Sequence, residues 1–368
     1  MLARCDPLPD RAALTAYRVA LLGLGTVGRA VAERLLDDAD ALADRAGGRR
    51  LELVAVAVRN PGRLEGLELP VGTVVAADPA SLVDNADVDG VVELMGGLQP
   101  AGSLVRAALA AGKAVVTANK ALLADAGPEL EALARRTEAP LRFEAAVAGG
   151  TPVLSVLAED LVAMRVQRIR GVVNGTTNWI LDAMEHEGMS AAEALAAAQA
   201  AGYTEADPTL DTEGHDAAQK LVILGRLAFG RWIRPEAVDR MAAEPPGQGG
   251  AGISQVSAEE VRSAARHEQR VRLVAQIASA DGALEASVTP RFLAHDDPLA
   301  AAKGITNVIE IEGSPHGRVV ISGPGAGGPA TAAAVLSDLM RLAQGAGSTW
   351  AGLPPATGDA GAVPRSLS

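Results

Sequence analysis

Cysteine, aromatic residues and long apolar runs are scarce in this chain, and each scarcity excludes a class of protein. The single cysteine, Cys5, has no partner for an intramolecular disulfide and rules out a zinc site built on several cysteines. No stretch of roughly 18 residues is apolar without a charge or a glycine, so no transmembrane helix is expected. Residues 1–17 lack the apolar core of a signal peptide. The sequence therefore favours a cytoplasmic protein with no membrane partner.

The charge balance and the length narrow the function further. A formal net charge of −12 argues against nucleic acid as a partner, because nucleic acid requires a basic face. The 368 residues suffice for two domains with cores of their own, and a hydrophobic content of 48% is ordinary for a globular enzyme. With 2% aromatic residues, those cores must be aliphatic. A small molecule is therefore the expected substrate.

Lysine is also rare, and the positions where it remains are informative. Only Lys113, Lys120, Lys220 and Lys303 occur among 33 Lys and Arg residues, so arginine meets the general need for positive charge. An ammonium group can release a proton, whereas a guanidinium group in a protein cannot. Lys220 follows a run of carboxylates within residues 205–216, which makes it a candidate catalytic residue. The alternative is that these few lysines survive by chance.

The first part of the chain alternates apolar strands with amphipathic helices. This alternation predicts an α/β fold, a Rossmann-like doubly wound parallel sheet that forms an NAD(P)-binding domain over residues 1–145. The expected strands are residues 17–22, 51–58, 90–93 and 114–117, and the expected helices are residues 29–42, 101–111 and 121–137.

The remainder of the chain has a different order of expected strands and helices and predicts an α+β domain over residues 146–322. Its expected strands are residues 167–173, 271–278, 284–289, 307–312 and 318–321, and its expected helices include residues 152–161, 191–201 and 216–228. Residues 323–344 form a glycine-rich turn and a last helix. Residues 345–368 are rich in Gly, Ala, Pro and Ser, so a disordered tail is expected there.

A glycine-rich turn follows the first expected strand. Gly23, Gly25 and Gly28 form a G-x-G-x-x-G pattern that also includes Thr26 and Val27. Such glycines let the backbone approach a pyrophosphate at the positive end of a helix. In an alternating domain the pattern predicts dinucleotide binding, whereas alone it could be an ordinary tight turn.

The end of the second expected strand bears on the choice of cofactor. An acidic residue there would bind the ribose 2′-hydroxyl of NAD, but this strand ends in Arg59. An arginine suits a 2′-phosphate, so the sequence predicts a preference for NADP, with NAD possible. The alternative is that Arg59 merely faces solvent.

Two further groups of residues carry the predicted chemistry. Thr117, Asn119 and Lys120 follow a strand at its carboxyl end, where open α/β sheets bind ligands. Asp216 and Lys220 are four residues apart, so they share one face of a helix. The pair could be a simple helical ion pair, or a carboxylate that holds an ammonium acting as proton donor to a carbonyl oxygen. The acids upstream would suit a substrate amine.

The ordered motifs resemble those of the homoserine dehydrogenases. They are GLGTVG at 23–28, ELMGG at 93–97, GKAVVTANK at 112–120, NGTTN at 174–178, GYTEADP at 202–208, DTEGHDAAQK at 211–220 and GPGAG at 323–327. The resemblance spans residues 17–343. It implies the NAD(P)H-dependent reduction of aspartate-4-semialdehyde to homoserine, a step towards threonine, methionine and isoleucine.

The resemblance also implies roles for individual residues. Lys220 and Lys120 match catalytic lysines, and Asp216 matches an acid that orients Lys220. The matching substrate-binding residues are Glu205, Asp211, Asn174, Gly175 and Thr176, and Gly325 matches a cofactor-binding position. A monovalent cation, usually Na⁺, would be bound by Glu144, Val147, Gly149 and Thr151, largely through backbone carbonyls.

The family resemblance leaves some matters open. It implies a homodimer that associates through the second domain. Many relatives continue into an ACT regulatory domain, for which residues 345–368 leave no room, so inhibition by threonine through such a domain is not expected. A different semialdehyde or amino-acid dehydrogenase and a non-catalytic NADP-binding sensor remain alternatives.

Overall fold

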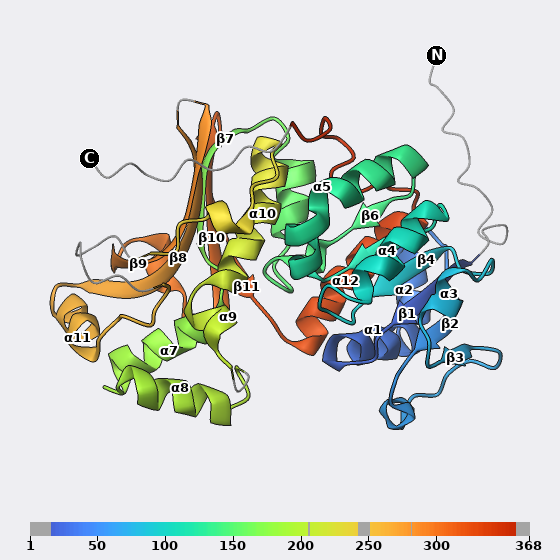
Figure 1. The fold of residues 1–368 in the computed structure, drawn as a ribbon, viewed down its shortest axis with the longest axis horizontal. Coiled ribbons are helices and arrows are strands. Elements are labelled where there is room, and N and C mark those ends of the chain that lie inside the picture. The colour runs from blue at the N-terminus through green and yellow to red at the C-terminus, as the bar shows by residue number, and fades with distance from the viewer. Residues whose placement is uncertain (1–15, 205–206, 242–250, 281, 358–368) are drawn as a thin grey trace, which may run out of the picture.

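The computed structural model describes residues 16–204, 207–241, 251–280 and 282–357. They form two sheets, one parallel and one antiparallel, which lie at opposite ends of the molecule (Figure 1). Helices α5 (Lys120–Thr137) and α10 (His215–Phe229) lie between the two sheets. None of the described helices is both long and apolar enough to span a membrane.

The parallel sheet has six strands in the order β3-β2-β1-β4-β5-β6. The strands are β1 (Tyr17–Leu22), β2 (Leu51–Ala57), β3 (Val74–Ala76), β4 (Gly90–Glu93), β5 (Ala114–Thr117) and β6 (Leu141–Arg142). Strands β1 and β4 are neighbours, and the strands that follow each of them extend the sheet in opposite directions. The strand order therefore reverses between β1 and β4. Ligands of open α/β sheets bind at such a switch point, beyond the carboxyl ends of the strands.

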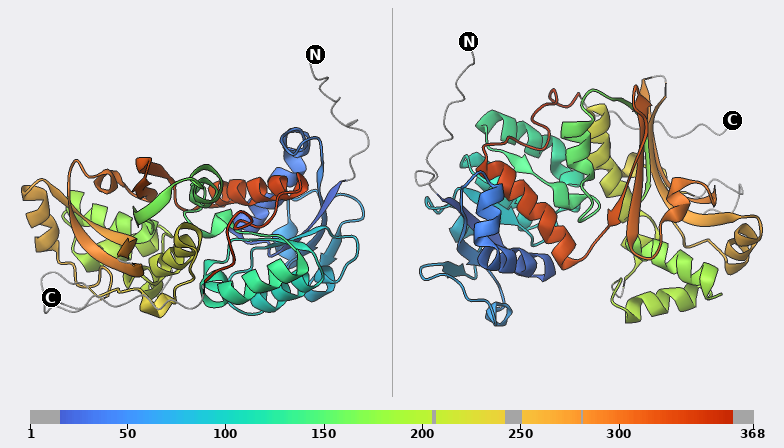
Figure 2. Two further views of the ribbon diagram at one scale, coloured as in Figure 1. Left: turned by 90° about the horizontal axis from the view of Figure 1, so that it is seen from above. Right: turned by 180° about the vertical axis from the view of Figure 1, so that it is seen from behind.

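Helices cover both faces of this sheet, which explains why its strands are mostly apolar. One face packs against α4 (Ala101–Ala110) and α5, and the other against α1 (Thr26–Asp37), α2 (Ala39–Arg45) and α12 (Gly328–Ala343). The short α3 (Ala80–Val83) precedes β4. Helix α12 lies alongside α1 although the two are some three hundred residues apart in the sequence (Figure 2).

The antiparallel sheet has five strands in the order β11-β10-β7-β8-β9. They are β7 (Arg165–Val172), β8 (Gln269–Ala280), β9 (Ala283–Ala294), β10 (Thr306–Ser314) and β11 (Gly317–Pro324). Around it lie α6 (Val153–Ser155), α7 (Gly175–His186), α8 (Ala191–Ala200), α9 (Thr209–Thr212), α10 and α11 (Ala258–Arg266). Alternate residues of the strands, such as Ile277 and Ile309, join one continuous core with α7 and α10.

The predicted fold class is confirmed, with differences in detail. The expected helix 29–42 is two helices that meet at Asp38, and the expected helix 152–161 is a single short turn, α6, followed by a π-helical turn over Val156–Asp160. Strands β3 and β6 and helices α3, α9 and α11 were not predicted. The first four of these have four residues or fewer, too short to display a period of alternation.

The expectation of a disordered tail was wrong for residues 345–357. The indole of Trp350 is 1% exposed and packs against Phe143 and Trp232, with ring centroids 5.1 and 6.3 Å away. The backbone N–H of Thr349 donates to Leu141 O at 3.1 Å. Burial of a large aromatic ring stabilises this segment by several kcal/mol at roughly 25 cal/mol per Å², which its Gly- and Pro-rich composition concealed. Residues 358–368 lie outside the described residues.

Candidate active site

The predicted glycine-rich turn lies between β1 and α1, at the switch point of the parallel sheet. Gly23 has φ +101°, a conformation that disfavours side chains. A Cβ atom on Gly28 would lie 2.1 Å from Gly23 O, so only glycine allows α1 to start this close to β1. The N-terminus of α12 meets the same turn, since a Cβ on Gly328 would lie 3.1 Å from the Thr26 side chain. Two helix N-termini thus converge where a pyrophosphate would bind.

A buried acid, Glu93, organises the next loop, and sequence reasoning gave it no role. Its side chain is fully buried at the carboxyl end of β4. One carboxylate oxygen accepts the N–H groups of Met95 (2.8 Å) and Gly96 (3.0 Å), and the other accepts Thr117 Oγ1–H at 2.6 Å. The signal that could have revealed it is an acid at the end of an otherwise apolar strand.

Asn119 connects this loop to α5. Its Nδ2 donates to Gly97 O at 2.6 Å, and its Oδ1 accepts the N–H of Leu122 at 3.1 Å, which caps the helix. Lys120 is the first residue of that helix. Asn119 thus caps helix α5. Its contacts fix the position of the first turn of that helix and therefore of the Lys120 backbone.

The two predicted catalytic lysines meet at one carboxylate. Lys220 Nζ donates to Asp216 Oδ2 at 2.7 Å and to Val173 O at 2.5 Å, and Lys120 Nζ lies 3.1 Å from Asp216 Oδ1. Lys220 is 8% exposed, whereas the side chain of Lys120 is 34% exposed. Residues one hundred positions apart in the sequence are therefore brought together, as the motif hypothesis requires.

Electrostatics keep Asp216 ionised. Burial alone would raise the pKa of this carboxyl group, but the charges of Lys220 and Lys120, with hydrogen bonds from Lys220 and Asn174, hold the pKa well below its usual value. The result is a permanent negative charge between two ammonium groups. Such a charge favours the protonated form of both lysines and holds their ammonium groups at one point.

Asn174 links the cluster to the other predicted substrate residues. Its Nδ2 donates to Asp216 Oδ2 at 2.9 Å and to Asp211 Oδ1 at 2.7 Å, while its Oδ1 caps α7 by accepting the N–H of Thr177. Gly175 is close-packed, because a Cβ there would lie 3.2 Å from Ile305. Asp211 also accepts Thr204 Oγ1–H at 3.1 Å.

Thr176 Oγ1 follows Gly175 on α7 and donates to Tyr203 O at 2.8 Å, so it holds the loop that precedes Glu205. The predicted substrate-binding residue Glu205 itself lies outside the described residues.

Two of the predicted cofactor residues lie apart from the lysine cluster. Arg59 is exposed just beyond the end of β2, beside the strand that leads into the glycine turn, and it forms no ion pair with a described residue. Gly325 lies on the chain that returns from β11 to α12. A Cβ on Gly325 would lie 2.4 Å from the fully buried amide of Asn307, so glycine is required there.

The predicted cation-binding passage forms the junction between the two sheets. Glu144 is buried, and its carboxylate accepts the N–H groups of Leu154 (3.0 Å) and Ser155 (2.7 Å). Burial, together with nearby Asp338, raises the pKa of Glu144. Thr151 Oγ1 donates to Pro324 O at 3.3 Å, so the passage contacts the returning chain.

The backbone oxygens of Val147 and Gly149 accept no hydrogen bond from a described group. The oxygen-only donor set fits a hard cation. A cation would also compensate the charge that burial makes costly on Glu144.

Elsewhere, Asp182, Glu185 and His186 lie close enough to suggest a metal site. However, Asp182 accepts Arg272 Nη2–H at 2.6 Å and the N–H of Gly304 at 2.6 Å, and Glu185 lies 3.4 Å from Arg272. These carboxylates are therefore engaged as the partners of a buried arginine, so this group has the character of a structural ion-pair cluster.

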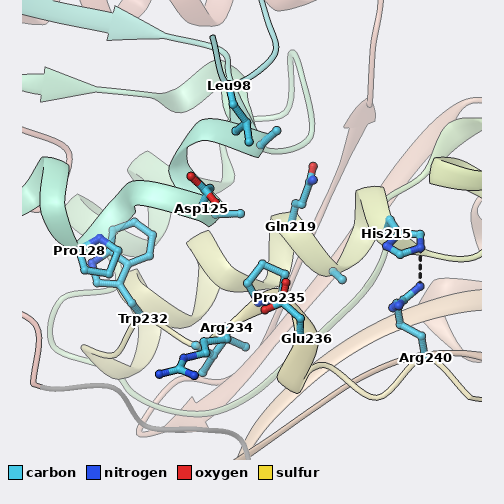
Figure 3. Close-up of a pocket in the computed structure, with 14 residues that line it drawn as sticks. Leu98, Asp125, Pro128, His215, Gln219, Trp232, Arg234, Pro235, Glu236 and Arg240 are labelled. Carbon is cyan, nitrogen blue, oxygen red and sulfur yellow. Dashed lines mark hydrogen bonds between the residues drawn. The ribbon is translucent and has the colours of Figure 1, made fainter. Parts of the chain in front are cut away.

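A cavity of about 690 Å³ opens beside α5 and α10 (Figure 3). Its lining includes Leu98, Asp125, His215, Gln219 and Trp232, but none of the clustered residues Lys120, Asp216 and Lys220. The cavity therefore lies next to the lysine cluster and separate from it, on an adjacent side of the two helices.

The glycine turn at a switch point, with a lysine cluster between two domains, defines the class of nicotinamide-dependent oxidoreductases. Comparison with known proteins gives the family. The family model "Homoserine dehydrogenase, NAD binding domain" matches residues 23–144, and the model "Homoserine dehydrogenase" matches residues 152–340. The chain belongs to the homoserine dehydrogenase family.

Individual homoserine dehydrogenases are also similar to this chain. The homoserine dehydrogenase of Corynebacterium glutamicum is 40% identical over 341 residues, which cover 91% of this chain and 74% of the relative. The crystal structure of the Thiobacillus denitrificans enzyme superimposes with a TM-score of 0.83 at 39% identity, covering 90% of this chain and 73% of that one. A hyperthermophilic archaeal homoserine dehydrogenase in complex with NADPH gives a TM-score of 0.73 at 30% identity, covering 89% and 97%.

Proposed function

We propose that this chain reduces aspartate-4-semialdehyde to homoserine with NADPH, reversibly, in the biosynthesis of threonine, methionine and isoleucine. The observation that carries the proposal is the Lys120–Asp216–Lys220 cluster, in which a lysine of the first domain meets a carboxylate and a lysine of the second. The bound cofactor supplies a hydride to the carbonyl carbon. Residues 1–145 would hold that cofactor, residues 146–322 the substrate, and residues 323–344 return the chain to the cofactor domain.

Lys220 and Lys120 are the proposed sources of the proton that converts the carbonyl oxygen into an alcohol. Each has an ammonium group paired with Asp216, whose negative charge keeps it oriented. Proton transfer by a positioned side chain contributes roughly 10²–10⁴-fold to a rate. After the transfer, Asp216 would remain ionised and favour reprotonation of the lysine from solvent.

The remaining polar residues of the site are proposed to bind the amine and the carboxylate of the substrate. Asp211 and Glu205 are proposed to bind the ammonium group, because paired carboxylates attract a cation. Asn174, Gly175 and Thr176 stand at the N-terminus of α7, where helix N–H groups favour a carboxylate. This arrangement would leave the aldehyde directed at the lysine cluster.

Arg59 supports NADP as the preferred cofactor, with NAD as a weaker one. It is exposed at the end of the strand next to β1, where the ribose of a dinucleotide bound to the glycine turn would lie. We also propose that Glu144, Val147, Gly149 and Thr151 hold Na⁺ and so stabilise the junction between domains.

The sodium proposal has a direct test. Replacement of NaCl by choline chloride at equal ionic strength should lower the midpoint of thermal unfolding. Glu144→Gln should remove that difference between the salts. An identical midpoint in both salts for the unaltered protein would refute the cation site.

A homodimer is proposed to form through the antiparallel sheet. The face of β10 and β11 that points away from α7 and α10 displays Arg318 and Val320, which are 54% (side chain) and 44% exposed. A second copy could cover this face. Light scattering of the purified protein distinguishes a dimer from a monomer, and a monomer at micromolar concentration would contradict the proposal.

The reaction is tested by the loss of NADPH absorbance with purified protein and aspartate-4-semialdehyde, beside a Lys220→Ala variant. Rapid oxidation that the substitution abolishes is the expected result. NADPH that binds without turnover would favour a non-catalytic sensor. Turnover with a different semialdehyde alone would assign another dehydrogenase activity.

A further inference from the structure

A second ion pair joins the two helices that carry the lysine cluster. Glu131 of α5 accepts two hydrogen bonds from Arg226 of α10, from Nε at 2.7 Å and from Nη2 at 2.6 Å. Trp232 Nε1 donates to the same carboxylate at 2.8 Å. Arg226 is completely buried and Glu131 is 3% exposed, so the pair is sealed from solvent.

The spacing of the two ion pairs along the helices is nearly equal. Lys120 and Glu131 are eleven residues apart on α5, and their partners Asp216 and Arg226 are ten residues apart on α10. At a rise of about 1.5 Å per residue, the two separations are about 17 Å and about 15 Å. The two contacting helices are therefore bridged at two levels, one at the lysine cluster and one in the buried interior.

The segment 345–357 covers the buried bridge. Arg226 Nη2 also donates to Pro354 O at 2.7 Å, and Arg135 Nη2 donates to Leu353 O at 3.0 Å. Trp350 lies with its ring edge-on to Trp232. The segment thus excludes water from the pair and supplies one further acceptor to Arg226 Nη2, while Arg226 Nη1 has no hydrogen-bond partner among the described residues.

Between the two bridges, apolar side chains of both helices, such as Leu123 and Leu221, join one core. The lining of the cavity beside the helices includes the small side chains of Ala121, Ala124 and Ala218. Small apolar contacts tolerate sliding, whereas a bidentate arginine–carboxylate pair has one geometry and breaks when either helix shifts. A buried ion pair adds little net stability over an apolar pair, and a defined register is its best-attested use.

We propose that Glu131 and Arg226 are positioning residues that fix the register of α5 against α10 and so hold Lys120 against Asp216. The inference rests on the proposed function for its catalytic consequence. Glu131 is eleven residues from Lys120 on α5 and is paired with Arg226, so it acts through the two helices.

The first test is kinetic. Glu131→Gln keeps the shape of the side chain but removes the charge, and Trp232→Phe removes one hydrogen bond to it together with part of the packing against Trp350. Both should lower kcat, the first by about ten-fold or more, since a misplacement of about 1 Å can cost roughly 10²-fold. The KM for NADPH should stay within about two-fold, because the glycine turn is untouched.

The matched control is Asp182→Asn, which breaks the buried Arg272–Asp182 pair within one domain. It should lower the thermal midpoint to a similar extent while kcat changes by less than about two-fold. An equal fall of kcat in Asp182→Asn, or an unchanged kcat in Glu131→Gln, would overturn the positioning role and leave a structural one.

The second test does not depend on activity. Unfolding free energies of Glu131→Gln, Lys120→Ala and the double variant form a cycle between sites about 16 Å apart. Changes in unfolding free energy at independent sites this far apart are additive, whereas the changes at two ion pairs that fix one helix register should be coupled. Additive values would overturn the inference. If the unaltered protein fails to turn over the semialdehyde, the proposed function is refuted. The cycle still decides whether the two ion pairs are coupled through the register of the helices.

Discussion

Lys120 and Asp216 form an ion pair of 3.1 Å that connects the helix following β5 to the helix following α9. The pair brings a lysine of the parallel-sheet domain onto a carboxylate that already holds Lys220. Because the glycine turn and the proposed substrate residues lie on different domains, we expect their relative orientation to decide whether both lysines can reach one oxygen.

Lys220→Arg should lower kcat by roughly 10²–10⁴-fold, because the guanidinium keeps the ion pair with Asp216 but cannot release a proton. Affinity for NADPH, measured by the quenching of tryptophan fluorescence, should change little. Lys303→Arg, at an exposed position, serves as the control and should retain full activity. If Lys220→Arg keeps its turnover, the proton comes from another group.

Asp216→Asn should reduce the unfolding free energy by about 3 kcal/mol at neutral pH, because it leaves the buried Lys220 without its anion. The pKa of Asp216 is lowered in the folded protein, so its stabilising effect is complete above the ordinary value of 3.8 and is lost as pH falls through the lower folded value. Urea unfolding at pH 8, 6 and 4 should therefore give a constant difference between the two proteins. A difference that shrinks between pH 8 and pH 6 would contradict the assignment.

Arg59→Ala should raise the KM for NADPH by about ten-fold or more and leave the KM for NADH unchanged, because only the former has a 2′-phosphate to pair with a guanidinium. Steady-state assays with both cofactors measure this. Arg136→Ala, another exposed arginine of the same domain, should affect neither value. A parallel change in both KM values would assign Arg59 a role unrelated to the phosphate.

Glu93→Gln should destabilise the protein by about 2 kcal/mol and weaken the binding of NADPH. The carboxylate accepts from two N–H groups and from Thr117 Oγ1, and an amide cannot accept at both of its ends. Thermal unfolding and NADPH titration provide the two measurements. Glu52→Gln, an exposed acid on β2, should leave both unchanged. Normal binding by Glu93→Gln would mean that the loop after β4 needs no fixed acceptor.

Gly325→Ala should cost about 2 kcal/mol and weaken cofactor binding, because the added Cβ would lie 2.4 Å from the buried amide of Asn307. Replacing that amide should relieve the clash, so Asn307→Ala in the same chain should recover part of the stability. Calorimetric midpoints of the two variants and the double variant decide the point. A double variant no more stable than Gly325→Ala would show that the constraint on Gly325 is not steric contact with Asn307.

The local features of this protein were readable from its sequence. The strands β1, β4 and β5 were predicted to the residue, because buried parallel strands are continuous apolar runs bounded by turn residues. The glycine turn, the lysines and Asp216 stood out because each needs a particular chemistry at a particular spacing. Asp216 and Lys220 share one helix, so their contact follows from a separation of four residues alone.

Contacts between distant segments required the tertiary structure. No local pattern indicates that Glu131 faces Arg226, because a buried charge on a helix resembles a surface charge until its partner is known. The same holds for Trp350, whose Gly- and Pro-rich surroundings predicted disorder although the indole is buried against Phe143 and Trp232. Periodicity reports which face of an element is apolar, whereas pairing between elements depends on how the whole chain packs. The sequence by itself thus determined the chemistry and the local elements, and packing decided which of them meet.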